Sequence, residues 1–461
     1  MKRLLLFAGL LGLSLSLVSC AGTSSSSTTP PGNSQAQVFI AGEDAPVPSV
    51  VSFYITLNSI TLNNSTGSVT VLSKAETVDF GRLVGLRSML GFNTVTPGTY
   101  TSATFSLASP VIYYVNMSTT PPSIGSINGT LTNSTVTVAF PTGSPLTVAS
   151  NGLAGLHMDF NLRQSLAVNS SGQITGSVNP VIDVAAVSAS SDLGQITEFN
   201  GSVLSVSSST FTMQGPYGFQ EVIDVNAQTL FNSTYTLATL PVNAIVSVEG
   251  TVQADGSILA SGVEVITTDA AFISGRILAV NPGPQVTMFV GEELPNLSPT
   301  IPVDTVYTVD LSSVAEYDVC FFDNWFTQQF FSGSTLVVGQ RIFVGGTFAN
   351  SAFTPEMVSL RRQGVLGTLV GNSVTIGDAS TNQGSFQMQN DLLLSYAAGG
   401  PSDPTAPFTV NSGAGTTFVN INGLSGLQTA GAANLAVRGL VFEDLSTGQP
   451  VVWAGRVRVL P

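Results

Sequence analysis

Residues 199–206 read Phe-Asn-Gly-Ser-Val-Leu-Ser-Val, and this segment returns later in the chain in two altered copies. One copy is Phe-Ile-Ser-Gly-Arg-Ile-Leu-Ala-Val at 272–280, and a fainter one is Val-Leu-Gly-Thr-Leu-Val at 365–370. In each copy a glycine is followed by alternating apolar residues, which is the pattern of a half-buried strand. Such internal similarity indicates a tandem repeat.

Each copy leads to a second strand that carries a glycine, and then to a short closing strand. The second glycines are Gly250, Gly346 and Gly439, and the closing strands are 262–265, 357–360 and 456–459. A glycine in the first strand suits the strong coiling of a small barrel. We therefore predict three tandem small β-barrels of one topology. Their ranges are 196–268, 270–363 and 364–461.

The composition favours an all-β protein of several domains. With 461 residues the chain is too long for a single core. Apolar residues make up 43% of it and charged residues only 9%, so Ser, Thr, Asn and Gly supply the polar surface. Segments rich in Val and Thr, separated by frequent turns, are typical of β-sheets.

The charge balance bears on the partners of the protein. The 27 acidic and 13 basic residues give a formal net charge of −14. A surface of this sign repels phosphate backbones, and no basic cluster departs from the average. Nucleic acid is therefore not expected as a partner.

The first 20 residues have the pattern of an export signal. Lys2 and Arg3 precede an apolar run, 4–17, that is too short to span a membrane as a mature helix. The run ends in Leu-Val-Ser-Cys at 17–20, which resembles the bacterial lipobox. By that resemblance Cys20 is acylated and becomes the new N-terminus. The alternative is an ordinary secretory signal with an incidental cysteine.

The residues after Cys20 bear on the location. Ala21 is not the aspartate that, by resemblance to enterobacterial lipoproteins, retains such proteins at the inner membrane. We therefore expect a lipid anchor in the outer membrane or at the cell surface of a bacterium, with about 0.8 kcal/mol from each buried methylene. Residues 21–36, rich in Ser, Thr, Gly and Pro, are predicted to be a flexible tether.

Residues 37–190 are predicted to form an antiparallel β-sandwich. Apolar residues alternate with polar ones at 51–58 and again at 156–162, and Asn-Asn-Ser-Thr-Gly at 63–67 marks a turn. The segment 79–86 is the best candidate for a short helix in this domain.

Several short motifs of this domain occur in the order found in bacterial domain of unknown function 4382. They are Val-Phe-Ile at 38–40, Asp-Ala-Pro at 44–46, the strand at 51–60, Pro-Gly-Thr-Tyr at 97–100, Met-Asp-Phe-Asn-Leu at 158–162 and Asn-Pro-Val-Ile at 179–182. The chain thus resembles that family over most of residues 37–188. Residues 196–268 resemble domain of unknown function 5666, which implies a small OB-like barrel, and the two later repeats resemble it more weakly. Neither resemblance implies an activity or a catalytic residue.

The sequence offers no catalytic residue, no cofactor site and no metal site. His157 is the single histidine, and it alternates out of the apolar face of its strand on the side of Asp159, so we expect a solvated or hydrogen-bonded residue there. No Gly-x-Ser-x-Gly elbow and no Cys-x-x-Cys pair are present. The acids lie mostly in apparent turns, such as 43–44 and 443–444, although a carboxylate pair across a cleft stays open. Cys320 is expected to be a small buried residue.

The densest aromatic stretch, residues 321–331, lies in the second repeat and reads Phe-Phe-Asp-Asn-Trp-Phe-Thr-Gln-Gln-Phe-Phe. It takes the place of residues 235–240 in the first repeat, where an OB-like barrel often carries a short helix. On a helical wheel the aromatics share one side. We predict a plug of the barrel, with Phe322 and Phe326 buried and Trp325 near the rim. The alternative is an exposed platform for a sugar or a protein, with Trp325, Phe326 and Phe330 as candidate binding residues.

These features favour a non-catalytic, lipid-anchored cell-envelope protein of tandem β-domains that acts in adhesion, assembly or ligand presentation. Its expected partners are the membrane, through the lipid anchor, and an envelope protein or polysaccharide. The alternative is an envelope carbohydrate-binding protein or a weak carboxylate-dependent hydrolase.

Overall fold

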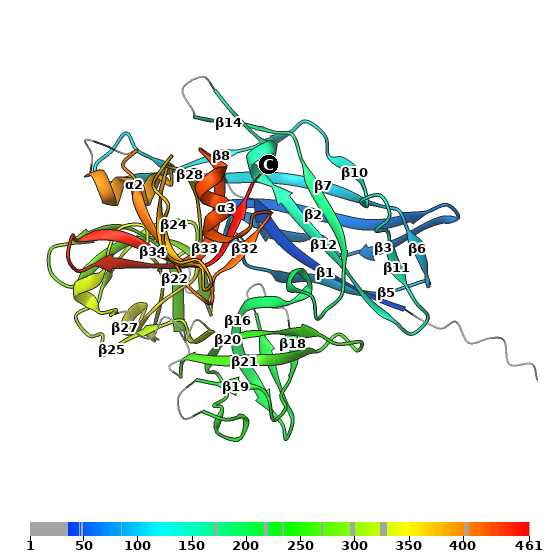
Figure 1. The fold of residues 1–461 in the computed structure, drawn as a ribbon. Coiled ribbons are helices and arrows are strands. Elements are labelled where there is room, and N and C mark those ends of the chain that lie inside the picture. The colour runs from blue at the N-terminus through cyan, green and yellow to red at the C-terminus, as the bar shows by residue number, and fades with distance from the viewer. Residues whose placement is uncertain are drawn as a thin grey trace, which may run out of the picture. The chain divides into compact units, whose positions relative to one another are not determined.

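The structure is a computed structural model that describes residues 36–45, 47, 49–83, 85–169, 173–215, 220–232, 235–268, 271–295, 300–322, 330–400, 403 and 405–460. Over these residues the protein consists of β-sheets, with short helices in the connections (Figure 1). The all-β fold predicted from the sequence is therefore confirmed. Among the helices of these ranges, none is long and apolar enough to cross a membrane.

The first domain is a sandwich of two sheets around one core. One sheet has the order β15-β12-β1-β5, and the other has the order β10-β7-β2-β3. Their strands are β1 (Ala36–Ala45), β5 (Ser88–Val95), β12 (Leu153–Asn161), β15 (Ile182–Val187), β2 (Val50–Asn64), β3 (Gly67–Leu72), β7 (Ser102–Asn116) and β10 (Thr135–Ala139). Phe53, Phe105 and Phe160 are fully buried in the core that the sheets share. Most pairs are antiparallel, as predicted, but β1 and β12 run parallel.

Smaller elements complete this domain. β4 (Glu76–Asp79) pairs with β2, and β8 (Ser123–Asn128) pairs with β7. The others are β6 (Gly98–Tyr100), β9 (Thr130–Leu131), β11 (Leu146–Val148), β13 (Leu166–Val168), β14 (Ile174–Val178), the helix α1 (Leu162–Ser165) and the 3-10 turns η1 (Phe80–Leu83) and η2 (Asp192–Gly194). η1 lies within the segment predicted as a short helix. β1 begins at the fully buried Ala36, so the last residue of the predicted tether belongs to the sheet.

Barrel 1, the green strands of Figure 1, is a closed ring. It consists of β16 (Ile196–Val206), β17 (Thr210–Gln214), β18 (Gln220–Asp224), β20 (Ile245–Val252) and β21 (Ile258–Thr267), with β19 (Leu230–Phe231) and the turn η4 (Leu237–Thr239) in the connection before β20. The strands pair in the order β18-β17-β16-β20-β21, and a parallel pairing of β18 with β21 closes the ring. A five-stranded ring of this kind is the architecture of an OB-fold barrel.

The next two repeats use the same strand order. Barrel 2 contains β22 (Ala271–Asn281), β23 (Gln285–Leu294), β24 (Thr305–Asp310), β25 (Glu316–Val319), η6 (Gly333–Thr335), β26 (Arg341–Ala349) and β27 (Ala352–Leu360). Barrel 3 contains β28 (Gln363–Leu369), β29 (Thr375–Asp378), β30 (Gln383–Gln389), α2 (Leu392–Gly399), β31 (Phe408–Ser412), β32 (Thr417–Val419), α3 (Gly423–Ala430), β33 (Asn434–Asp444) and β34 (Gln449–Val459). In each barrel the first strand pairs with the penultimate long strand, which in turn pairs with the last. On its other side the first strand pairs with the second strand in barrels 1 and 2, whereas in barrel 3 it pairs with β30, because β29 is an additional strand that pairs only with β30.

The glycines that reveal the repeat in the sequence occupy equivalent positions. A Cβ atom on Gly201, Gly275 or Gly367 would lie 2.7, 1.8 or 2.3 Å from a backbone carbonyl oxygen of a strand that pairs with the first strand of its barrel, namely β17, β23 or β30. Each of these oxygens belongs to the residue after a methionine: Gln214, Phe289 and Gln389. The second glycines, Gly250, Gly346 and Gly439, each follow a β-bulge against the last strand. The three repeats therefore share one order of their main strands, with the additional strand β29 in the third, whereas the predicted domain bounds stay a prediction.

Candidate functional site

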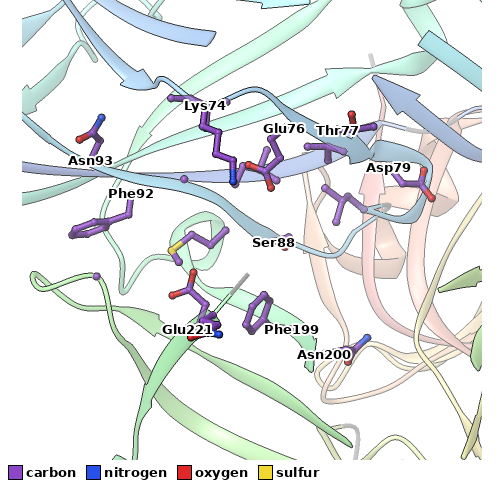
Figure 2. Close-up of a pocket in the computed structure, with 18 of the residues that line it drawn as sticks. Lys74, Glu76, Thr77, Asp79, Ser88, Phe92, Asn93, Phe199, Asn200 and Glu221 are labelled. Atoms are coloured by element: carbon purple, nitrogen blue, oxygen red, sulfur yellow. The ribbon is translucent and has the colours of Figure 1, made fainter. Parts of the chain in front are cut away.

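A pocket with a volume of ≈ 580 Å³ lies where the first domain meets barrels 1 and 2 (Figure 2). The first domain contributes residues 71–79, 82–83 and 88–93, barrel 1 contributes 198–200, 220–222 and 255–257, and barrel 2 contributes 291–292. This volume lies in the range of pockets that enclose a small organic ligand.

One wall of the pocket is fixed by the way β4 joins β2. The antiparallel pairing sets Glu76 opposite Leu57 and Asp79 opposite Tyr54. Asp79 is held in place because the Ser52 hydroxyl donates to its Oδ2 at 2.7 Å and the Phe53 N–H donates to its Oδ1 at 2.8 Å. These bonds anchor the strand that carries Glu76.

The apolar part of the lining contains two aromatic rings among aliphatic side chains. Phe92 from β5 and Phe199 from β16 are both half-buried, and they pack against a buried cluster that includes Phe39 and Ile196. Gly256, in the turn between β20 and β21, has a φ of +93°, and a Cβ atom there would lie 3.1 Å from the Phe92 ring. The turn can lie this close to the ring because glycine has no side chain.

Two carboxylates on opposite sides of the pocket have raised pKa values. Figure 2 shows Glu76 beside Lys74 on one side, and Glu221 near Phe199 on the other. Burial raises the pKa of Glu76 to about 7; the Lys74 charge opposes this shift, and the Glu221 charge adds to it. Burial also raises the pKa of Glu221 to about 7. Each carboxylate therefore takes up a proton near neutral pH.

The deepest part of the lining holds paired charges. Arg82 Nη1 lies 2.7 Å from Glu292 Oε1, and Asn200 Nδ2 donates to Glu292 Oε2 at 3.1 Å. Glu198 Oε1 lies 2.5 Å from Arg341 Nη1. Burial opposes ionisation of Glu198. The positive charges of Arg341, Arg361 and Arg362 nevertheless hold the pKa of Glu198 below its usual value.

The predicted histidine lies in a buried charge network, outside the pocket. His157 on β12 is 6% exposed, and its Nε2 lies 3.1 Å from Oε2 of Glu43 on β1. From barrel 3, Arg456 Nη1 lies 3.6 Å from Glu43 Oε1, and Arg458 Nη1 lies 3.5 Å from Asp159 Oδ2. His157 is therefore hydrogen-bonded, which is one of the two environments expected from the sequence. The other expectation, a solvated side chain, is wrong because His157 is buried.

The expectation that residues 43–44 form a solvated turn is also wrong. Glu43 and Asp44 belong to β1 and are each 3% exposed. Burial works against ionisation of Glu43, but the hydrogen bond with His157 and the charges of Arg87 and Arg456 lower its pKa to about 2. The adjacent cavity of ≈ 30 Å³ has room for little more than a water molecule. We therefore regard this network as a structural contact between the sandwich and barrel 3.

Replacing His157 with alanine should lower the free energy of unfolding by about 1–3 kcal/mol, because the buried Glu43 loses its hydrogen-bond partner. Urea denaturation would measure the change. His157→Gln, which keeps a side-chain donor, is the matched control and should cost less. A loss within about 0.5 kcal/mol for His157→Ala, as at a surface position, would contradict this structural role.

The aromatic candidates are only partly within the described residues. Trp325 and Phe326 lie outside them, so their predicted roles are untested. Phe330 is 59% exposed, whereas Phe331 is 7% exposed. Phe322 is half-buried rather than buried, and it packs against the core of barrel 2. The predicted lipidation site, Cys20, also lies outside the described ranges, and Cys320 is buried as expected.

Sequence analysis did not identify the pocket residues. Glu76 and Glu221 lie far apart in the chain, on strands that look like ordinary half-exposed strands. The 27 acidic residues leave open a carboxylate pair across a cleft, but the sequence does not indicate which two residues form it. Within the described residues, no group of three or more His, Cys, Asp or Glu side chains could hold a metal ion.

Two family models match the chain, one over the first domain and one over barrel 1. Residues 35–175 match the model of Domain of unknown function (DUF4382), and residues 194–264 match that of Domain of unknown function (DUF5666). The chain thus contains these two domains, in the order that the sequence motifs predict. Barrels 2 and 3 lie outside both matched ranges, although they share the strand order of barrel 1.

No curated protein matches the chain. Among solved structures, a multidomain protein with nucleic acid binding domains from Streptococcus pneumoniae TIGR4 is 9% identical over 57% of this chain and 72% of that chain, with a TM-score of 0.12. A TM-score this low supports no argument about fold or function.

Proposed function

We propose that the protein is a non-catalytic, lipid-anchored component of the bacterial cell envelope that binds a small ligand and presents it at the membrane surface. The observation that carries the proposal is the pocket of ≈ 580 Å³ with its aromatic and carboxylate lining. The export signal, the lipobox at Cys20 and the polar tether support the location. The outer membrane or the cell surface is favoured over the inner membrane.

The ligand-binding part of the proposal can be tested by filling the pocket. Ser88 is half-buried in the lining and labelled in Figure 2. A Ser88→Trp variant would place a bulky indole ring in the lining of the cavity. We expect at least one compound from a panel of amino acids, diamines, polyamines and oligosaccharides to bind the native protein in calorimetry and to lose that binding in Ser88→Trp. If no compound shows this difference, the pocket is not a ligand site.

Lipidation at Cys20 is a separate expected outcome. Mass spectrometry of the mature protein purified from membranes of a bacterial host should show an acylated cysteine as the first residue. A Cys20→Ser variant should lose the acyl mass and leave the membrane fraction. A mature chain that begins with an unmodified Ala21, or that retains Met1, would contradict the anchor.

A second candidate function is carbohydrate binding with weak hydrolysis. It is favoured by Glu76 and Glu221, because a carboxylate with a raised pKa can act as a general acid, and glycosidases use two carboxylates. Release of nitrophenol from nitrophenyl glycosides would reveal this activity. It must disappear in Glu76→Gln or Glu221→Gln to support an enzyme; activity that survives both variants comes from a contaminant.

A further inference from the structure

We infer that the ligand of this pocket is an organic cation whose ammonium group lies between Glu76 and Glu221, with its carbon skeleton against Phe92 and Phe199. This inference rests on the proposed ligand-binding function and goes beyond it by naming the chemical class of the ligand.

The charge of the lining favours a cationic ligand. The carboxylates are Glu76, Asp79, Glu198, Glu221, Asp255 and Glu292, and the cationic side chains of the lining are Lys74 and Arg82. Glu292 is paired with Arg82, and Glu198 is paired with Arg341 from outside the lining. Asp79 and Asp255 accept hydrogen bonds from neighbouring serines. Lys74 then faces two carboxylates, Glu76 and Glu221, so the site has an excess negative charge when both are ionised, and a cation would neutralise that charge.

Buried acceptors without a hydrogen bond favour the same class of ligand, independently of the charge of the lining. Asn200 is 2% exposed; its Nδ2 donates to Glu292, and its Oδ1 accepts no hydrogen bond. Oε2 of the buried Glu198 likewise accepts no hydrogen bond. Among the described residues of the lining, no buried nitrogen donor lacks a hydrogen bond in this way. Buried polar atoms are normally satisfied, so these acceptors favour a ligand that donates hydrogen bonds, as an ammonium does.

The size and polarity of the pocket also favour an organic cation. A pocket of ≈ 580 Å³ is far larger than a bare metal ion requires, and the described residues contain no metal-binding group of three. The rings of Phe92 and Phe199 offer apolar surface and π-faces that attract an organic cation. An aliphatic or aromatic amine uses both features of the lining, whereas a neutral sugar leaves the two carboxylates uncompensated.

The inference predicts that binding depends on pH. The groups that face the two carboxylates are Lys74 in the turn before β4, Asp79 on β4, Arg82 in η1, Glu198 on β16, Asp255 in the β20–β21 turn and Glu292 on β23. Glu76 and Glu221 each hold a proton well below pH 7, and a bound ammonium favours their ionised forms. Affinity should therefore rise between pH 5 and pH 8, by at least about tenfold.

The experiment is calorimetric titration of the native protein with 1,5-diaminopentane and spermidine, and with 1,5-pentanediol as the neutral analogue of the same length. We expect the amines to bind at pH 8, to bind at least about tenfold more weakly at pH 5, and to bind at least about tenfold more weakly to Glu76→Gln and Glu221→Gln. Glu316→Gln removes an exposed carboxylate on β25, outside the lining, and should leave binding unchanged.

The outcomes separate this inference from the proposed function. If an oligosaccharide or other neutral compound binds and Ser88→Trp abolishes its binding, while the amines do not bind, the pocket is a ligand site but the inference is wrong. If the amines bind equally to the Ser88→Trp and glutamine variants, they are attracted only by the overall negative charge, and the inference is again wrong. If no compound of any class binds in a way that Ser88→Trp abolishes, the proposed function fails as well.

Discussion

Replacing Arg361 with methionine should lower the free energy of unfolding by about 3–5 kcal/mol. Arg361 follows β27 and is 0% exposed, with its guanidinium 4.1 Å from the centre of the Phe343 ring. Its Nη1 donates to Oε2 of Glu264, on β21 of barrel 1, at 2.6 Å. The methionine would fill much of the space but would leave the buried carboxylate of Glu264 without its cation.

Chemical denaturation would measure this loss, and a double variant provides the matched control. Arg361→Met combined with Glu264→Gln removes both charges, so it should recover much of the stability that the single variant loses. A loss below about 1 kcal/mol for Arg361→Met alone would show that water or a rearranged side chain compensates Glu264. In that case the charge pair would not hold barrels 1 and 2 together.

Replacing Gly275 with alanine should cost about 3 kcal/mol or more, because the new methyl group has no space. A Cβ atom at this position would lie 1.8 Å from the Phe289 carbonyl oxygen. That oxygen belongs to the backbone of β23, which is paired on one side with β22 and on the other with β24. The clash can be relieved only by moving a strand of the barrel.

Gly371→Ala is the control for this substitution, because a Cβ atom at Gly371 would have no neighbour within 4 Å. Its effect should stay within about 0.5 kcal/mol. Thermal or urea unfolding of the two variants measures the difference. Equal effects would mean that the close approach of β22 to β23 does not explain why glycine occurs at this point of the repeat.

The sequence predicts the repeats well because their signal is local. Gly275 and its equivalents stand in short strands whose alternation can be read directly. The carbonyl oxygen that each approaches lies in the next strand for Gly201 and Gly275, and one strand further on for Gly367. The same holds for the sandwich, where the alternating residues around Phe53 and Phe160 form its core.

The charged groups could not be predicted in the same way. Glu43 and Asp44 resemble a solvated turn because nothing nearby in the sequence neutralises them. The partners of Glu43 are His157 and Arg456, and Asp44 accepts a hydrogen bond from the Leu162 N–H. Likewise, the environments of Glu76 and Glu221 depend on how the first domain packs against barrel 1. Burial disfavours the ionised form of an acidic side chain. Whether such a side chain is buried depends on contacts between segments that are distant in the sequence.

The position of β1 determines how the domain would respond to tension. The described chain enters the fold at Ala36, the first residue of β1, and β1 lies between β12 and β5 in its sheet. A pull on the chain ahead of Ala36 acts along the axis of a strand that is hydrogen-bonded on both sides. The bonds of both ladders then bear the load together in shear, instead of opening one after another as at a peeled edge. A membrane tether attached at this point would apply force to an interior strand of the sandwich, where the fold resists mechanical unfolding.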